Sequence, residues 1–251
     1  MEQAHLPMSH DPLLVGVSFL IAIFAAYAAL SIINRLRQAS ANKGWLWLGA
    51  VTFGLGVWAM HFTAMTALRL SVLVAYDPLL TLISVLFAIA GAAAAFRLVS
   101  RPEVGWVQIL GSGFFLGAGI GTMHYTGMFA MRLDAWMTFN LPLVALSVLV
   151  AVVLGTFGIW TLISPVFSRV PFRHLVTAVV TGLAIPFMHY TAMLAVRFTA
   201  TGDNQIHSMV ASGHLLSLNI FLLFAVAVLG LPMFFTSLLE SPTGQTQEAE
   251  A

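Results

Sequence analysis

Three short segments decide how this chain folds: "WAMHFTAM" at 58–65, "GTMHYTGM" at 121–128 and "PFMHYTAM" at 186–193. Each places the pattern Met-His-(Phe or Tyr)-Thr-small-Met inside a long apolar run, where a polar side chain is costly. The histidines of the three segments, His61, His124 and His189, are 63 and 65 residues apart. Chance does not match six positions three times, so the chain contains a three-fold repeat.

The composition is typical of an integral membrane protein. Sixty per cent of the 251 residues are hydrophobic and 8% are charged, whereas charged residues make up about a quarter of a soluble domain. A transmembrane helix needs roughly 20 mainly apolar residues. We therefore predict an all-α membrane protein with seven transmembrane helices, near 13–34, 45–68, 78–97, 105–131, 140–164, 174–196 and 213–239.

These helices are predicted to form one membrane domain over 13–239, preceded by an extracytoplasmic segment, 1–12, and followed by a cytoplasmic polar tail, 240–251. The first twelve residues contain no Lys or Arg, unlike the start of a cleavable signal peptide, so the first apolar run is kept as a helix. Cysteine is absent, which excludes disulfides and thiolate metal sites. A net charge of +1 argues against a nucleic-acid partner.

The distribution of positive residues predicts the orientation in the membrane. The loops after the first, third and fifth helices carry seven Lys and Arg residues, and the N-terminus with the other loops carries three. Because positive loops stay in the cytoplasm, the bias predicts an N-out, C-in topology. The three remaining arginines follow the motif helices and are expected at the outer membrane interface, where their charge reaches the headgroups: Arg69, Arg132 and Arg197.

The repeat predicts that the three histidines meet. The second, fourth and sixth helices carry the motif and run in the same direction, so each histidine should lie at a similar depth in the outer leaflet. Small residues seven and five positions before each histidine allow close helix approach: Gly54/Gly56, Gly117/Gly119 and Gly182/Ala184. The intervening helices share only their apolar character, so the likeness is expected to be confined to the motif segments.

The residues of the motif predict a metal site, with hydrogen-bonded packing of the histidines as the alternative. Methionine four residues after histidine shares its helix face, and methionine one residue before it lies about 100° away. Imidazole with thioether suits one or two copper ions, while zinc and haem stay open. The predicted ligands are His61, His124, His189, Met60, Met123, Met188, Met65, Met128 and Met193, with Tyr125, Tyr190, His10 and His214 as a second shell or cap.

Three linked copies of Met-His-(Tyr/Phe)-Thr on alternate helices resemble the MHYT family of bacterial membrane sensor domains. The resemblance covers about 13–239 and implies a copper site, held by the motif residues, that detects a diatomic gas (oxygen, carbon monoxide or nitric oxide) or redox state. It also implies that the domain is not itself an enzyme and signals to a cytoplasmic module, such as one acting on cyclic di-GMP. The chain is expected to be either a stand-alone member or part of a longer protein, and the sequence leaves a homodimer open.

Two other functions compete with sensing. A copper transporter would use the same ligands, but conduction needs binding sites through the whole membrane, and the inner halves of these helices hold no comparable ligands. A zinc hydrolase would need an acid or base beside the metal; the available carboxylates, Asp77, Asp134 and Asp203, fall in predicted outer loops. A retinal photoreceptor is excluded because the only lysine, Lys43, lies in a loop.

Overall fold

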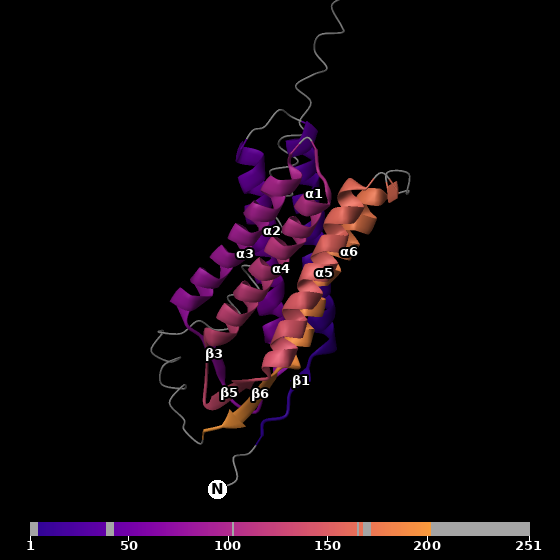
Figure 1. The fold of residues 1–251 in the computed structure, drawn as a ribbon. Coiled ribbons are helices and arrows are strands. Elements are labelled where there is room, and N and C mark those ends of the chain that lie inside the picture. The colour runs from indigo at the N-terminus through magenta and orange to yellow at the C-terminus, as the bar shows by residue number, and fades with distance from the viewer. Residues whose placement is uncertain (1–4, 39–42, 102, 165, 168–171, 202–251) are drawn as a thin grey trace, which may run out of the picture.

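A computed structural model describes residues 5–38, 43–101, 103–164, 166–167 and 172–201. Six helices in these ranges are long and apolar enough to cross a membrane (Figure 1). They are α1 (Pro12–Gln38), α2 (Lys43–Ala67), α3 (Pro78–Val99), α4 (Trp106–Phe129), α5 (Leu141–Ile163) and α6 (Arg173–Met193). The predicted seventh helix, 213–239, and the tail, 240–251, lie outside the described residues.

The six helices form a closed ring. Each helix packs against the next along the chain, and α6 returns to pack against α1. The motif helices α2, α4 and α6 also contact one another. Over the most hydrophobic stretch of each helix, 83%, 50% and 56% of the residues of α2, α4 and α6 are buried. The corresponding shares for α1, α3 and α5 are 39%, 33% and 28%. The motif helices therefore line the centre, and α1, α3 and α5 are the peripheral helices.

Short strands join the helices at one end of the bundle (Figure 1). They form three antiparallel pairs: β1 (Ser9–His10) with β2 (Leu68–Arg69), β3 (Val74–Tyr76) with β4 (Met131–Leu133), and β5 (Ala135–Phe139) with β6 (Val196–Ala200). Each repeat is thus a strand, a peripheral helix, a motif helix and a second strand that pairs with the first. We call these the first, second and third repeats.

The short strands are an addition to the predicted helical architecture and change where the motif helices end. The motif helices were predicted to run to 68, 131 and 196, but they end at Ala67, Phe129 and Met193. The arginines that follow lie on β2, β4 and β6 instead of at helix ends. Strands of two to five residues are too short to show an alternating pattern, and each is stabilised by a partner about 60 residues away along the chain.

The peripheral helices begin in the same way in all three repeats. The expectation that the third, fifth and seventh helices share only apolar character is therefore wrong for α3 and α5, and the seventh lies outside the described residues. Their N-cap side chains each accept a hydrogen bond from a backbone N–H of the first turn, which satisfies an otherwise unpaired donor. These caps are Asp11 (to Leu14, 3.3 Å), Asp77 (to Leu80, 3.0 Å) and Asn140 (to Leu143, 3.3 Å). The backbone N–H of each cap residue also donates to the carbonyl six positions after the motif histidine, at 2.8–2.9 Å.

Glycines bring the repeats into close contact, as predicted. A Cβ added seven positions before each histidine would come within 2.6–2.7 Å of a backbone atom on the peripheral helix of the next repeat. The three contacts are Gly54 with Ile89, Gly117 with Val152 and Gly182 with Ile23. Since backbone atoms cannot move aside individually, a larger side chain at any of these positions would separate two helices.

Candidate metal site

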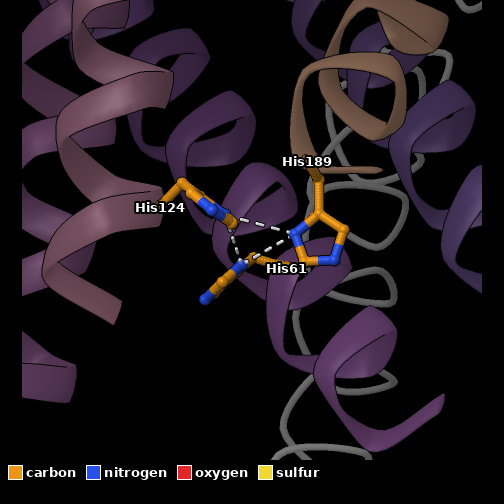
Figure 2. Close-up of side chains that lie close together, drawn as sticks. All are labelled: His61, His124 and His189. Atoms are coloured by element: carbon orange, nitrogen blue, oxygen red, sulfur yellow. Dashed lines mark hydrogen bonds between the residues drawn. The ribbon is translucent and has the colours of Figure 1, made fainter. Parts of the chain in front are cut away.

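The three motif histidines meet at the centre of the bundle, which confirms the predicted convergence (Figure 2). His61 lies on α2, His124 on α4 and His189 on α6, each four to six residues before its helix ends. All three side chains are buried. Their Nδ1 atoms point toward one another and form a nearly equilateral triangle with sides of 3.1, 3.2 and 3.2 Å. The site is therefore close to the strand end of the bundle.

This triangle cannot be satisfied by hydrogen bonds alone. A neutral imidazole offers at each ring nitrogen either one hydrogen or one lone pair, not both. Three atoms that all contact one another cannot alternate donor with acceptor, so at least one side of the triangle joins two like groups. Three converging lone pairs are instead the arrangement that a central cation stabilises. The packing alternative for the histidines thus leaves one close contact unexplained.

The dimensions of the triangle also suit a metal ion. Three nitrogens that share a tetrahedral ion at the usual distance of about 2.0 Å lie roughly 3.3 Å apart, close to the 3.1–3.2 Å between these Nδ1 atoms. Within the described chain, this is the one group of three or more His, Asp or Glu side chains with such convergence. Three protein ligands leave a fourth tetrahedral position for a small molecule.

One glycine makes room for His61. A Cβ added at Gly127 of α4 would lie 2.6 Å from His61 Nε2 and 3.0 Å from His61 Cδ2. The corresponding positions of the other repeats, three residues after the histidine, hold Ala64 and Ala192. The His61 ring therefore reaches across to the α4 backbone in a way that its two counterparts do not require.

Aromatic side chains surround the triad in two layers. The residue after each histidine, Phe62, Tyr125 or Tyr190, sets its ring nearly perpendicular to the imidazole, with centroids 4.7–4.9 Å apart. The residue before each N-cap of a peripheral helix covers that ring edge-on at 5.2–6.0 Å, and these covering residues are Tyr76, Phe139 and His10. His10, predicted as a cap, thus contacts Tyr190.

His10 lies on β1, and its Nε2 is buried without a hydrogen-bond partner in the described part of the chain. This burial lowers the pKa of His10 below its usual value. The other predicted cap, His214, lies outside the described residues. Apart from His10, the covering layer was missed by sequence reasoning, although one signal was available: an aromatic or imidazole ring precedes each of the three N-cap residues.

All six motif methionines are buried in the core that surrounds the histidines. They are Met60, Met65, Met123, Met128, Met188 and Met193, each with 2% or less of its surface exposed. Methionine commonly fills such cores, so burial alone agrees with a packing role and with a ligand role. Their coordination of a metal remains a prediction.

The arginines that follow the motif form an ion pair with the N-cap aspartate of the same repeat in two of the three repeats. Arg69 forms an ion pair with Asp11 at 3.0 Å, and Arg132 forms one with Asp77 at 2.9 Å. The third repeat places Asn140 where the others have aspartate. The backbone N–H of Leu80, together with Arg132, holds the pKa of Asp77 below its usual value. The carboxylates of Asp11 and Asp77 are thus engaged in capping and pairing.

The comparisons with known proteins agree with this repeat. The profile of the MHYT family, described as a bacterial signalling protein N-terminal repeat, matches residues 2–42, 54–112, 117–176 and 182–246. The chain is 35% identical over 194 residues to the bifunctional diguanylate cyclase/cyclic di-GMP phosphodiesterase MucR of Pseudomonas aeruginosa. This matched region covers 76% of the chain and 28% of the relative. It is 34% identical over 195 residues to the cyclic di-GMP phosphodiesterase NbdA of the same organism, covering 74% of the chain and 24% of the relative.

The signalling protein YkoW of Bacillus subtilis is 27% identical over 198 residues, which cover 76% of the chain and 24% of that relative. The chain thus spans about a quarter of the length of these relatives. No solved structure matches significantly. Six helices able to span a membrane and a profile that matches nearly the whole length lead to one conclusion: the chain is a multi-pass membrane protein that belongs to the MHYT family of bacterial signalling proteins.

Proposed function

We propose that this chain is a membrane sensor whose triad, His61, His124 and His189, holds a copper ion and detects a diatomic gas or a change in redox state. The observation that carries the proposal is the triangle of Nδ1 atoms, 3.1–3.2 Å apart. Bound copper would supply a redox-active centre with affinity for oxygen, carbon monoxide or nitric oxide. The buried, apolar surroundings of the triad exclude water, which suits a site for such small apolar molecules.

The donor groups favour copper over other ions. Magnesium and calcium need several oxygen ligands, and no carboxylate belongs to the described cluster. A haem does not fit a site whose three ring nitrogens lie within 3.2 Å of one another. Three imidazoles accept zinc as well as copper, but six buried methionines around them favour the softer ion.

The three-helix origin of the ligands supports signalling. Each histidine belongs to a different motif helix, so any change in the distances between the Nδ1 atoms must move α2, α4 and α6 relative to one another. Two relatives are named as cyclic di-GMP enzymes and are about four times longer than the matched region. We propose that the chain is the input domain for an output of this kind, without catalysis of its own.

The orientation follows from the excess of positive residues in the loops after the first, third and fifth helices. On this basis the triad lies toward the periplasmic face of the inner membrane, and the signal passes to a cytoplasmic module. The two competing functions receive less support. For hydrolysis, Asp11 and Asp77 are poor candidates for a general base, because arginines and helix N-termini engage their carboxylates.

Metal analysis of detergent-purified protein tests the proposal. Wild type, the triple variant His61→Ala/His124→Ala/His189→Ala and the control His174→Ala, at the opposite end of α6, are offered Cu(I), Cu(II) and Zn(II) and then measured by mass spectrometry. We expect copper in the wild type and the control and none in a folded triple variant. A folded wild type that retains no copper would overturn the proposal, and stoichiometric zinc would favour the hydrolase instead. Spectra of the copper protein under carbon monoxide and nitric oxide then test gas binding.

A further inference from the structure

Each peripheral helix carries one serine that faces the interior at the same position. Ser18, Ser84 and Ser147 stand seven residues after the N-cap residue, and all three are fully buried. Each Oγ lies 2.6–2.7 Å from the carbonyl oxygen three residues earlier, in Val15, Thr81 and Val144. Because a carbonyl only accepts, each serine must donate its single hydrogen to its own helix.

Each serine also meets an aromatic side chain from the motif helix of the preceding repeat. Tyr125 Oη lies 2.8 Å from Ser147 Oγ, and Tyr190 Oη lies 3.2 Å from Ser18 Oγ. Since the serine hydrogen is already used, the phenol must be the donor in both pairs. The contacts bridge α4 to α5 and α6 to α1, which are two of the three boundaries between repeats.

At the third boundary, between α2 and α3, the buried serine accepts its hydrogen bond from a different donor. The first repeat has Phe62 in place of tyrosine, so no phenol reaches Ser84. Instead Trp58, one turn earlier on α2, donates its Nε1–H to Ser84 Oγ at 3.2 Å and to the Thr81 carbonyl at 3.1 Å. The other repeats have Gly121 and Pro186 where Trp58 stands. A donor from the motif helix thus reaches the buried serine at every boundary.

We propose that these three bonds form a bracing ring that fixes the rotation of the motif helices and so positions the histidine triad. Tyr125 and Tyr190 are each adjacent to a triad histidine, and neighbouring side chains on a helix are about 100° apart. When the phenol is held by the next repeat, the imidazole is turned toward the centre. Trp58 performs the same role for His61 from three residues away.

The ring also ties the repeats into one closed unit. The peripheral helix of each repeat holds the motif helix of the one before it, and the α6 to α1 bond completes the circle. A rotation of one motif helix therefore strains its hydrogen bond to the serine of the next repeat and displaces the peripheral helix that carries this serine. The bracing ring rests on the proposed metal site only in the part of its test that uses a bound metal.

A double-mutant cycle at Tyr125 and Ser147 separates positioning from ordinary packing. Ser147→Ala leaves the half-buried phenol of Tyr125 without its serine acceptor, whereas Tyr125→Phe leaves Ser147 bonded to its own helix. The double variant removes both groups and should lose less than Ser147→Ala alone. The control is Ser31→Ala, since Ser31 donates to the carbonyl of Tyr27 in its own helix and forms no hydrogen bond with a motif helix in the described part of the chain.

Two readouts are taken on the intact, detergent-purified chain. The first is the thermal midpoint of the metal-free protein, which is independent of the proposed metal role. The second is the affinity and visible spectrum with Co(II), a spectroscopic probe of tetrahedral nitrogen sites. We expect Ser147→Ala to bind Co(II) about tenfold more weakly than the wild type and to shift the absorption bands. Losses of this size are typical when a group that orients a metal ligand is removed. Tyr125→Phe/Ser147→Ala should recover part of that affinity, and Ser31→Ala should match the wild type.

The outcomes distinguish the two proposals. If the wild type binds no Co(II) or copper, the proposed function fails, while a non-additive thermal cycle still supports the bracing ring. If all variants lower the thermal midpoint equally and leave the Co(II) spectrum unchanged, the serines are structural only and the ring does not position the triad. Strict additivity of the two single changes in both readouts would also overturn it.

Discussion

Gly127 gives the most direct test of the triad geometry, because it alters no proposed ligand. In Gly127→Ala the new Cβ would stand 2.6 Å from His61 Nε2, 3.0 Å from Cδ2 of the same ring and 3.5 Å from Phe62 Cζ. Carbon and nitrogen in ordinary contact are about 3.5 Å apart, so the ring must retreat by roughly 0.9 Å. Metal sites tolerate ligand shifts of only about 0.2 Å, so His61 should no longer reach the position shared by His124 and His189.

The expected effect on binding is large and the effect on stability is small. Displacement of one of three ligands should weaken copper affinity about 100-fold, which corresponds to about 2.7 kcal/mol. Overpacking costs about 1–3 kcal/mol, and replacing glycine by alanine within a helix returns up to about 1 kcal/mol. The variant should therefore fold, with a thermal midpoint a few degrees from that of the wild type.

Competition against a copper chelator, followed by thermal unfolding without metal, measures both quantities. Gly16→Ala is the matched control, because a Cβ at this exposed helical glycine of α1 meets nothing within 4 Å. It should leave copper affinity unchanged and slightly raise the midpoint. A folded Gly127→Ala protein with wild-type copper affinity would refute the reasoning, since His61 would then be able to leave its observed position without loss of the metal.

Two further predictions concern the frame around the triad. Asp77→Asn should retain the helix cap but lose the Arg132 pair, at a cost of about 0.5 kcal/mol. Because the folded-state pKa of Asp77 is depressed, its contribution is fully present above about pH 4 and is lost progressively as pH falls through that lowered value; chemical unfolding should show a smaller deficit for the variant at pH 3 than at pH 7, and an equal deficit at both would contradict this. Gly117→Ala should lower stability by about 1–3 kcal/mol, because the added Cβ would lie 2.6 Å from the backbone nitrogen of Val152; a thermal midpoint equal to that of the wild type would show that α4 and α5 do not need this close approach.

The sequence predicted the histidine site better than it predicted the strands and the contacts between repeats. Duplication places His61, His124 and His189 at the same point of three helices that run in the same direction, so their convergence required only that the repeats share a centre. The glycines were equally readable, since small residues at fixed distances before a histidine have few other uses within membrane helices. Both inferences depend on residues that are close together in the sequence.

The strands and the bracing ring could not be read in the same way. Each strand has a partner roughly 60 residues away, and two paired residues such as His10 and Leu68 show no local pattern. Ser18 and Tyr190 are 172 residues apart, so nothing in either segment indicates their contact. The exchange of a phenol for Trp58 hides the third bond even when the repeats are aligned.

The sequence by itself determined that the chain forms long apolar helices and that three copies of one motif stand at the same point of helices running in the same direction, because both follow from local composition and from repetition. Only the tertiary structure decided that a buried serine of each peripheral helix meets a donor from the motif helix of the preceding repeat, and that the three imidazoles meet through Nδ1 at 3.1–3.2 Å. Which ring nitrogen faces inward depends on side-chain rotation within packed helices. That rotation is set by contacts such as Gly127 with His61, which exist only once the chain has folded.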